Sequence, residues 1–116
     1  MTARQDFTID AGRDWGLVVV ITEDDGETPL DLSECTLAWA ASRAAGQPAL
    51  ISKTSDDADE ILITSEEDGE ATIFLIPADT EDLGGVTCEH ELVVTDAASA
   101  ESTVLRGFVT IAKSLV

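Results

Sequence analysis

The feature that most constrains this chain is a succession of short strand-like runs with turn residues between them. No stretch shows the sustained apolar stripe of an amphipathic helix. The runs are rich in β-branched residues and recur at the spacing of β-sandwich strands. They cover residues 6–9, 15–22, 35–43, 49–53, 61–64, 71–76, 86–95 and 102–113. Because the connections are short, we predict an all-β, antiparallel β-sandwich of seven or eight strands.

Turn chemistry between the runs supports this division. Asp68-Gly69 is a strong hairpin signal, since glycine adopts a positive φ without strain. Residues 77–85 begin with proline, carry acids early and end in glycine. That pattern predicts about one helical turn around residues 79–83. In the last run, Gly107 predicts a kink or a bulge.

The side-chain pattern predicts which residues fill the core. Residues 17–21 are apolar on both faces, which is typical of a central strand. Trp39 is expected to be the central core plug, and Phe108 also fits a core position. The alternation in residues 86–95 places inward Val86, Cys88, His90, Leu92 and Val94. The core residues that we predict are Trp39, Leu37, Val18, Val20, Phe74, Ile76, Leu92, Val94 and Val109.

Length and charge exclude several classes of function. The chain of 116 residues has the size of one domain, so we expect residues 1–116 to form a single domain. Its 24 acidic residues against 6 basic ones give a formal net charge of −18. Such a surface is unsuited to nucleic acid or to anionic membranes, which both need Lys and Arg. Solubility explains the acidic excess, and cation binding, a halophilic source or a basic partner are the alternatives.

Nothing in the sequence indicates export or membrane insertion. The first 15 residues lack the apolar segment of a signal peptide. The longest apolar run, residues 17–21, is too short to cross a bilayer. We expect a soluble protein made in a cytoplasm.

Residues that carry chemistry are few. Cys35 and Cys88 lack the spacing of zinc or iron–sulfur ligands. We expect free buried thiols, with a Cys35–Cys88 disulfide as the alternative. His90 lies two residues from Cys88 on one strand face, a spacing that does not make a hydrogen-bonded catalytic pair. We therefore predict a packed strand histidine, no catalytic, cofactor-binding or metal-binding residues, and no enzymatic activity.

Three acidic clusters and one tryptophan leave binding hypotheses open. The clusters lie at residues 23–27, 56–60 and 66–70. We expect solvated turns, and the alternative is a Ca²⁺ site, which needs six to eight oxygen ligands. None of the clusters has the EF-hand pattern. Trp15 is the aromatic residue most expected at the surface, which gives thin support for a glycan-binding platform.

The order of short motifs resembles the immunoglobulin-like domains of phage tail and baseplate proteins, such as the N-terminal domain of baseplate upper proteins. The resemblance extends over roughly residues 5–113. Its first half rests on residues 26–32 (GETPLDL), 36–39 (TLAW) and 46–53 (GQPALISK). Its second half rests on residues 68–75 (DGEATIFL), 78–83 (ADTEDL), 91–96 (ELVVTD) and 104–111 (VLRGFVTI). Cys88 and His90 stand where the family usually carries aromatic residues.

The resemblance implies an immunoglobulin-like β-sandwich and a structural role in a virion. We expect a tail, baseplate or head–tail component of a phage or prophage that contacts other virion proteins or itself. The alternatives are a capsid decoration protein and a module that binds a host-surface glycan or Ca²⁺; small-molecule ligands and cofactors are not expected. Residues 104–111, if outermost in their sheet, and the tail at 113–116 are the expected contact segments. We expect the contact to bury on the order of 1,200 Å² or more.

Overall fold

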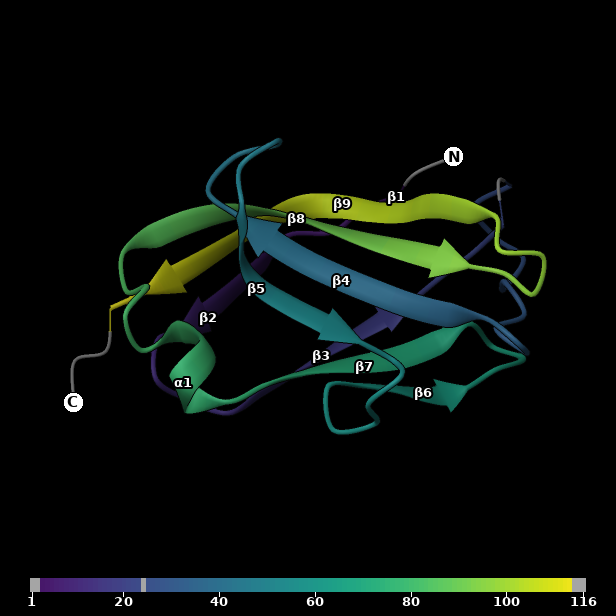
Figure 1. Ribbon diagram of the computed structural model, residues 1–116, viewed down its shortest axis with the longest axis horizontal. Coiled ribbons are helices and arrows are strands. Elements are labelled where there is room, and N and C mark those ends of the chain that lie inside the picture. Colours follow the sequence, from purple (N-terminus) through teal and green to yellow (C-terminus); the bar gives the residue numbers. More distant parts are fainter. Residues whose placement is uncertain (1–2, 24, 114–116) are drawn as a thin grey trace.

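Two β-sheets lie face to face in the computed structural model, which describes residues 3–23 and 25–113 (Figure 1). The strands of the larger sheet are β1 (Ala3–Arg4), β2 (Phe7–Asp10), β4 (Thr36–Ser42), β5 (Ala49–Thr54), β8 (Val86–Thr95) and β9 (Glu101–Ala112). Those of the smaller sheet are β3 (Trp15–Val20), β6 (Ile61–Ser65) and β7 (Glu70–Leu75). All eight predicted strands are therefore present, and β1 is an additional short one.

The strand order is that of an immunoglobulin-like sandwich. The six-stranded sheet has the order β1-β9-β8-β4-β5, with β2 also against β9, and the three-stranded sheet has the order β3-β7-β6. Immunoglobulin-like domains place their third, sixth and seventh strands in one sheet and their second, fourth and fifth in the other. Here β4, β8 and β9 fill the first set, and β3, β6 and β7 the second. The predicted immunoglobulin-like fold is confirmed.

The pairing departs from the antiparallel expectation at the N-terminus. β1 and β2 run parallel to β9, with Ala3 opposite Leu105 and Phe7 opposite Val109. The other strand pairs are antiparallel. The N-terminal segment therefore completes the larger sheet. In the described part of the chain, β3 has a strand neighbour only in β7.

The core lies between the sheets and confirms the predictions for β4, β8 and β9. Trp39 is 1% exposed, and the alternating residues of β8 point inward as predicted. The confirmed core residues are Trp39, Leu37, Leu92, Val94 and Val109. Cys88 and His90 are buried beside them.

The predicted faces of β3 and β7 are wrong. Val18, Val20 and Ile76 are exposed, and Phe74 is half-buried. Their neighbours point inward instead: Leu17, Val19, Ile21, Ala71, Ile73 and Leu75. β3 is an edge strand rather than a central one, and one face of its sheet meets water. Because residues 17–21 are apolar at every position, a one-residue shift in the expected face was invisible in their pattern.

Three expectations for β9 are also corrected. The register shift between β8 and β9 lies at Leu92 and Val93, not at Gly107. Phe108 is 40% exposed instead of buried. β9 lies between β8 and the N-terminal strands, so residues 104–111 are not an outermost edge. Of the predicted docking tail, residues 114–116 lie outside the described residues.

One helical turn, α1 (Pro77–Thr80), follows β7, close to the predicted position. The buried Thr80 hydroxyl accepts a hydrogen bond from the Gly12 amide at 2.9 Å. This bond ties the turn to the connection between β2 and β3. Over the described residues, no helix has the length and apolar character needed to span a membrane.

Candidate functional site

The one histidine lies at the centre of a buried hydrogen-bond relay. Trp39 Nε1 of β4 donates to His90 Nδ1 of β8 at 3.0 Å. On the other side of the ring, His90 Nε2 lies 2.6 Å from the carbonyl oxygen of Gln5. The imidazole is also flanked by the rings of Phe7 and Trp39, with centroids 5.3 and 5.8 Å away. The relay therefore joins the core to the segment between β1 and β2.

The relay fixes the protonation state of His90. An indole nitrogen can only donate, so Nδ1 of His90 must be the acceptor and Nε2 must carry the proton that goes to Gln5. A doubly protonated ring would direct Nδ1–H at the Trp39 N–H. Burial lowers the pKa of His90, against the opposing effects of the Gln5 carbonyl and Asp6. With both ring nitrogens engaged, His90 has no lone pair to offer as a general base.

Gly107 lets the N-terminal segment approach β9. A Cβ atom at position 107 would lie 2.0 Å from the Gln5 carbonyl oxygen and 2.7 Å from Asp6 Oδ1. Asp6 Oδ1 accepts a hydrogen bond from the Phe108 amide at 2.9 Å. This bond, followed by that from Arg4, lowers the pKa of Asp6. We refer to Gln5, Asp6, Trp39, His90 and Gly107 as the N-terminal junction.

The two cysteines are free thiols rather than a disulfide; Cys88 is buried as expected, whereas Cys35 is only half-buried. Burial raises the pKa of both thiols. Around Cys35, the carboxylates of Asp96, Asp31 and Glu34 raise it further. At Cys88, the nearby Arg43 opposes the effect of burial on the thiol pKa, but burial is the larger effect. The protonated thiol that burial favours is the weaker nucleophile.

The outer face of the six-stranded sheet is hollowed. A hollow of about 700 Å³ extends across β4, β8 and β9 to the loop between β4 and β5. Small side chains, Ala40, Ser42 and Ala49 among them, make up much of its lining. A second hollow of about 370 Å³ shares Ala40 and Glu91 with the first and extends toward β5. Together they make one shallow trough, which we call the groove face.

The groove face carries both signs of charge. Arg106 forms an ion pair with Glu91 at 3.3 Å, and both side chains are well exposed. The Arg4 guanidinium lies 5.3 Å from the centre of the Phe108 ring, a cation–π contact. The charged residues that line the larger hollow are Arg4, Arg106, Glu89 and Glu91. The two positive and two negative charges cancel, although the whole chain has a formal net charge of −18.

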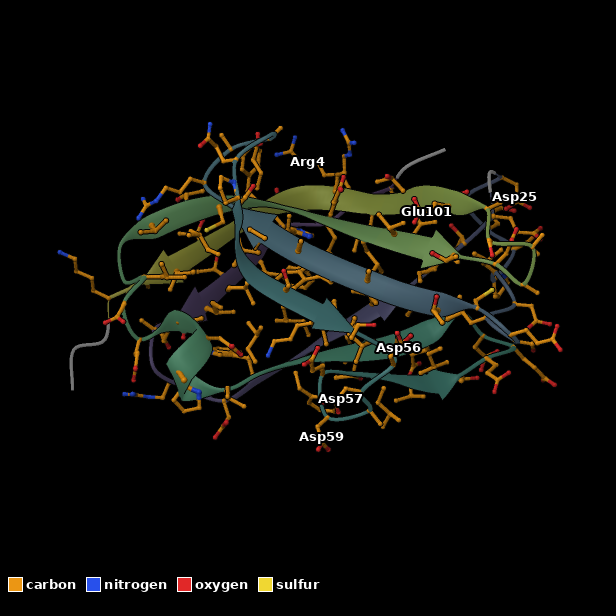
Figure 2. All side chains as sticks on the ribbon, in the orientation of Figure 1. Arg4, Asp25, Asp56, Asp57, Asp59 and Glu101 are labelled. Atoms are coloured by element: carbon orange, nitrogen blue, oxygen red, sulfur yellow. The ribbon has the colours of Figure 1, made fainter. Side chains whose placement is uncertain are left out.

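Two of the three acidic clusters come together at one end of the sandwich. The Leu32 amide donates to the Glu66 carbonyl at 2.9 Å, and the Ile21 amide to the Gly69 carbonyl at 2.8 Å. Figure 2 shows Asp25 and Glu101 at this end, where the turn between β8 and β9 also lies. We call these loops the acidic end; its carboxylates belong to Glu23, Asp25, Glu27, Asp31, Glu34, Glu66, Glu67, Asp68, Asp96 and Glu101. The third cluster is separate, since Asp56, Asp57 and Asp59 lie along the lower side in Figure 2.

Several of these carboxylates bind their own backbone. Asp25 Oδ1 accepts from the amides of Glu27 and Thr28, and Asp96 Oδ1 from those of Ala98 and Ala100. The Thr28 hydroxyl, together with these amides, lowers the pKa of Asp25. Among the described residues, no group of three or more His, Cys, Asp or Glu side chains is arranged to hold a metal ion.

Trp15 offers little to a glycan. Its ring is half-buried, and its Nε1 donates to the Asp10 carbonyl at 3.1 Å. The more exposed aromatic side chain is Phe108, for which the sequence predicted a core position. The alternation of faces along the strand could have predicted this exposure. Val109 is buried, so the adjacent Phe108 faces outward.

The sequence also gave no signal for the partners of His90. Gln5 is 85 positions from His90 and belongs to no motif. A glycine inside a strand can mark either a bulge or a close backbone approach, and at Gly107 the second holds. The groove face also depends on the pairing of the N-terminal strands with β9, because β1 places Arg4 beside the hollow.

No protein-family model and no curated protein sequence matches the chain. Among solved structures, it is similar to one of ICOS in complex with ICOS-L and an anti-ICOS-L VNAR domain. The similarity covers 97% of this chain and 56% of that chain, at 14% sequence identity and a TM-score of 0.42. The chain thus spans little more than half the length of that matched chain.

Proposed function

We propose that this protein is a structural subunit of a phage or prophage particle, in the tail, the baseplate or the head–tail region. It works by packing against other virion proteins or copies of itself, and it resides in the virion. The assignment to a phage particle is supported by the sequence, in which short motifs follow the order found in tail and baseplate domains. The proposal that it works by contact is carried by one structural observation, the large apolar side chains on its outer surfaces.

These side chains lie on both sheets. Val18, Val20 and Leu62 are exposed on the three-stranded sheet, and Leu50 and Phe108 on the six-stranded sheet. Their exposed fractions run from 40% to 55%. Exposed apolar groups on regular, rigid strands are suited to burial against another protein. The polar groups that could do chemistry are engaged within the fold instead, His90 in its relay and Asp25 and Asp96 in their turns.

The proposal is tested in particles purified from a strain that carries the gene. We expect quantitative mass spectrometry to find the protein at a fixed ratio to the tail or capsid proteins. Deleting the gene should lower the yield of infectious particles or leave particles with altered morphology in electron micrographs. Expression of the wild-type gene in trans should restore both, which controls for effects on neighbouring genes.

Two outcomes bear against the proposal. If particles lack the protein and the deletion strain produces normal yield and morphology, the protein is not a structural subunit. If the protein is present but its loss affects only adsorption to host cells, the glycan-binding alternative replaces it. Separation of heads from tails before mass spectrometry distinguishes a tail position from a capsid decoration protein.

A further inference from the structure

We propose that the groove face is a contact surface for a second copy of this chain, so that two copies pack with their groove faces together. This inference rests on the proposed function, because it names the partner and the surface of a protein that works by contact. Three observations carry it: the charge of the face, its area and its relief.

Charge selects this face for self-contact. A chain of formal net charge −18 repels its copies through most of its surface. At the acidic end, ten or so carboxylates would meet their like, and none of the six basic residues lies in those loops. On the groove face, Arg4 and Arg106 offset Glu89 and Glu91. Two such faces can therefore approach with little net repulsion. Within one copy, Arg4 pairs with Asp6 and Arg106 with Glu91, each at 3.3 Å. Both pairs are exposed, so their guanidinium groups can exchange these partners for carboxylates of the other copy.

Area separates the groove face from the other apolar surface. A stable contact buries roughly 600 Å² or more on each partner. Neighbouring strands lie about 4.8 Å apart, so the five strand positions of the larger sheet span about 24 Å. The strands of this sheet from β4 onward average about nine residues, or roughly 27 Å, so that face offers roughly 650 Å² in projection. The three-stranded sheet offers only about 300 Å² by the same measure, which is too little for a stable contact.

The relief of the groove face suits interlocking. Ala40, Ser42 and Ala49 line the trough with small side chains, Phe108 lines it with a large, 40% exposed ring, and Leu50 is exposed on the same sheet. A two-fold dimer brings each raised side chain of one copy against the surface of the other. Phe108 of each copy can then fill part of the partner's trough, as buried aromatic anchors do at the centres of interfaces.

The first test measures self-association of the whole purified chain by sedimentation velocity and light scattering. Protein concentration is raised to about 1 mM, at low salt and at about 0.5 M NaCl. We expect a monomer–dimer equilibrium that strengthens with salt, because screening weakens the repulsion between the acidic surfaces outside the contact. Phe108→Asp should raise the dissociation constant at least about tenfold. The matched control is Val18→Asp on the three-stranded sheet, which should leave the dissociation constant unchanged.

The second test uses charge complementarity and does not depend on Phe108. Arg106→Glu makes the groove face acidic, and Glu91→Arg makes it basic, so each variant alone should dimerise less than the wild type. An equal mixture of the two should form a heterodimer more tightly than either variant pairs with itself. Native mass spectrometry separates the three species by mass, and circular dichroism checks that each variant keeps its fold.

A chain that stays monomeric at all these concentrations and salt conditions overturns the inference. So does a dimer that Phe108→Asp leaves intact, that Val18→Asp weakens equally, or whose charge variants show no preference for the mixture. The proposed function fails separately: a monomeric protein that is nonetheless required in particles keeps the structural role and loses only the second copy as its partner.

Discussion

The N-terminal junction and the acidic end are both built from segments far apart in the sequence, yet different groups hold them. At the junction, buried side chains bind one another and the Gln5 carbonyl. At the acidic end, backbone amides bind backbone carbonyls between loops, and the exposed carboxylates of Asp25 and Asp96 bind amides of their own turns. Trp39 and His90 tolerate no unsatisfied polar atom, because both side chains are buried away from water. The acidic end tolerates many charges, because water solvates them.

The two regions should therefore respond differently to substitution. Substitutions at the junction should act through packing and protonation, and those at the acidic end through backbone conformation.

Trp39→Ala should have the largest effect, since it breaks the junction from the core side. The change leaves a cavity in place of a side chain that is 1% exposed, and it removes the donor to His90 Nδ1. We expect a loss of about 3–5 kcal/mol in the free energy of unfolding, measured by urea denaturation. Trp39→Phe retains most of the apolar volume but not the N–H, and should cost less. A loss below about 1 kcal/mol for Trp39→Ala would contradict the structure.

Gly69→Ala tests the acidic end. Gly69 has a φ of 66°, and a Cβ atom there would lie 2.3 Å from the Ile21 carbonyl oxygen. We expect a loss of roughly 2–3 kcal/mol, from backbone strain and from the displaced loop contact. Gly46→Ala is the matched control, because Gly46 has a φ of 84° and nothing within 4 Å of the added Cβ. Equal losses for the two variants would show that the loops are not packed as described.

His90 should make stability depend on pH in a way that the acidic end does not. Its folded-state pKa is lowered from the usual 6.5, so the unfolded chain binds the proton more readily. The stabilisation is therefore complete above about pH 6.5 and is lost as pH falls from there toward the folded-state pKa. The slope reaches at most about 1.4 kcal/mol per pH unit.

The check compares wild type with His90→Gln in urea unfolding from about pH 7.5 to about pH 5. Glutamine can accept from Trp39 and donate to Gln5 but does not titrate. Since His90 is the one histidine, the difference between the two curves isolates its effect from that of the carboxylates. Parallel curves would mean that the ring nitrogens are not held in the relay.

Local pattern predicted much of the fold. The strands from residues 36–42 and 86–95 alternate clearly, and the residues expected inward there are buried, except Val86 at the start of β8, which is half-buried. Turn residues marked the hairpin at Asp68-Gly69 and the helical turn at Pro77–Thr80. The predicted buried face of β3 was wrong, because a strand that is apolar at every position carries no signal of which side faces water.

Neighbouring residues and composition were enough to predict the succession of strands along the chain, the turns, the buried tryptophan and the acidic surface. Only the tertiary structure decided that Gln5 binds His90, that Gly107 makes room for the N-terminal segment, and that charges cancel on the groove face. Each of these depends on β1 and β2 pairing with β9, about a hundred residues further along the chain. Alternation along a strand reports which face a residue occupies, but it does not report which distant strand lies beside it.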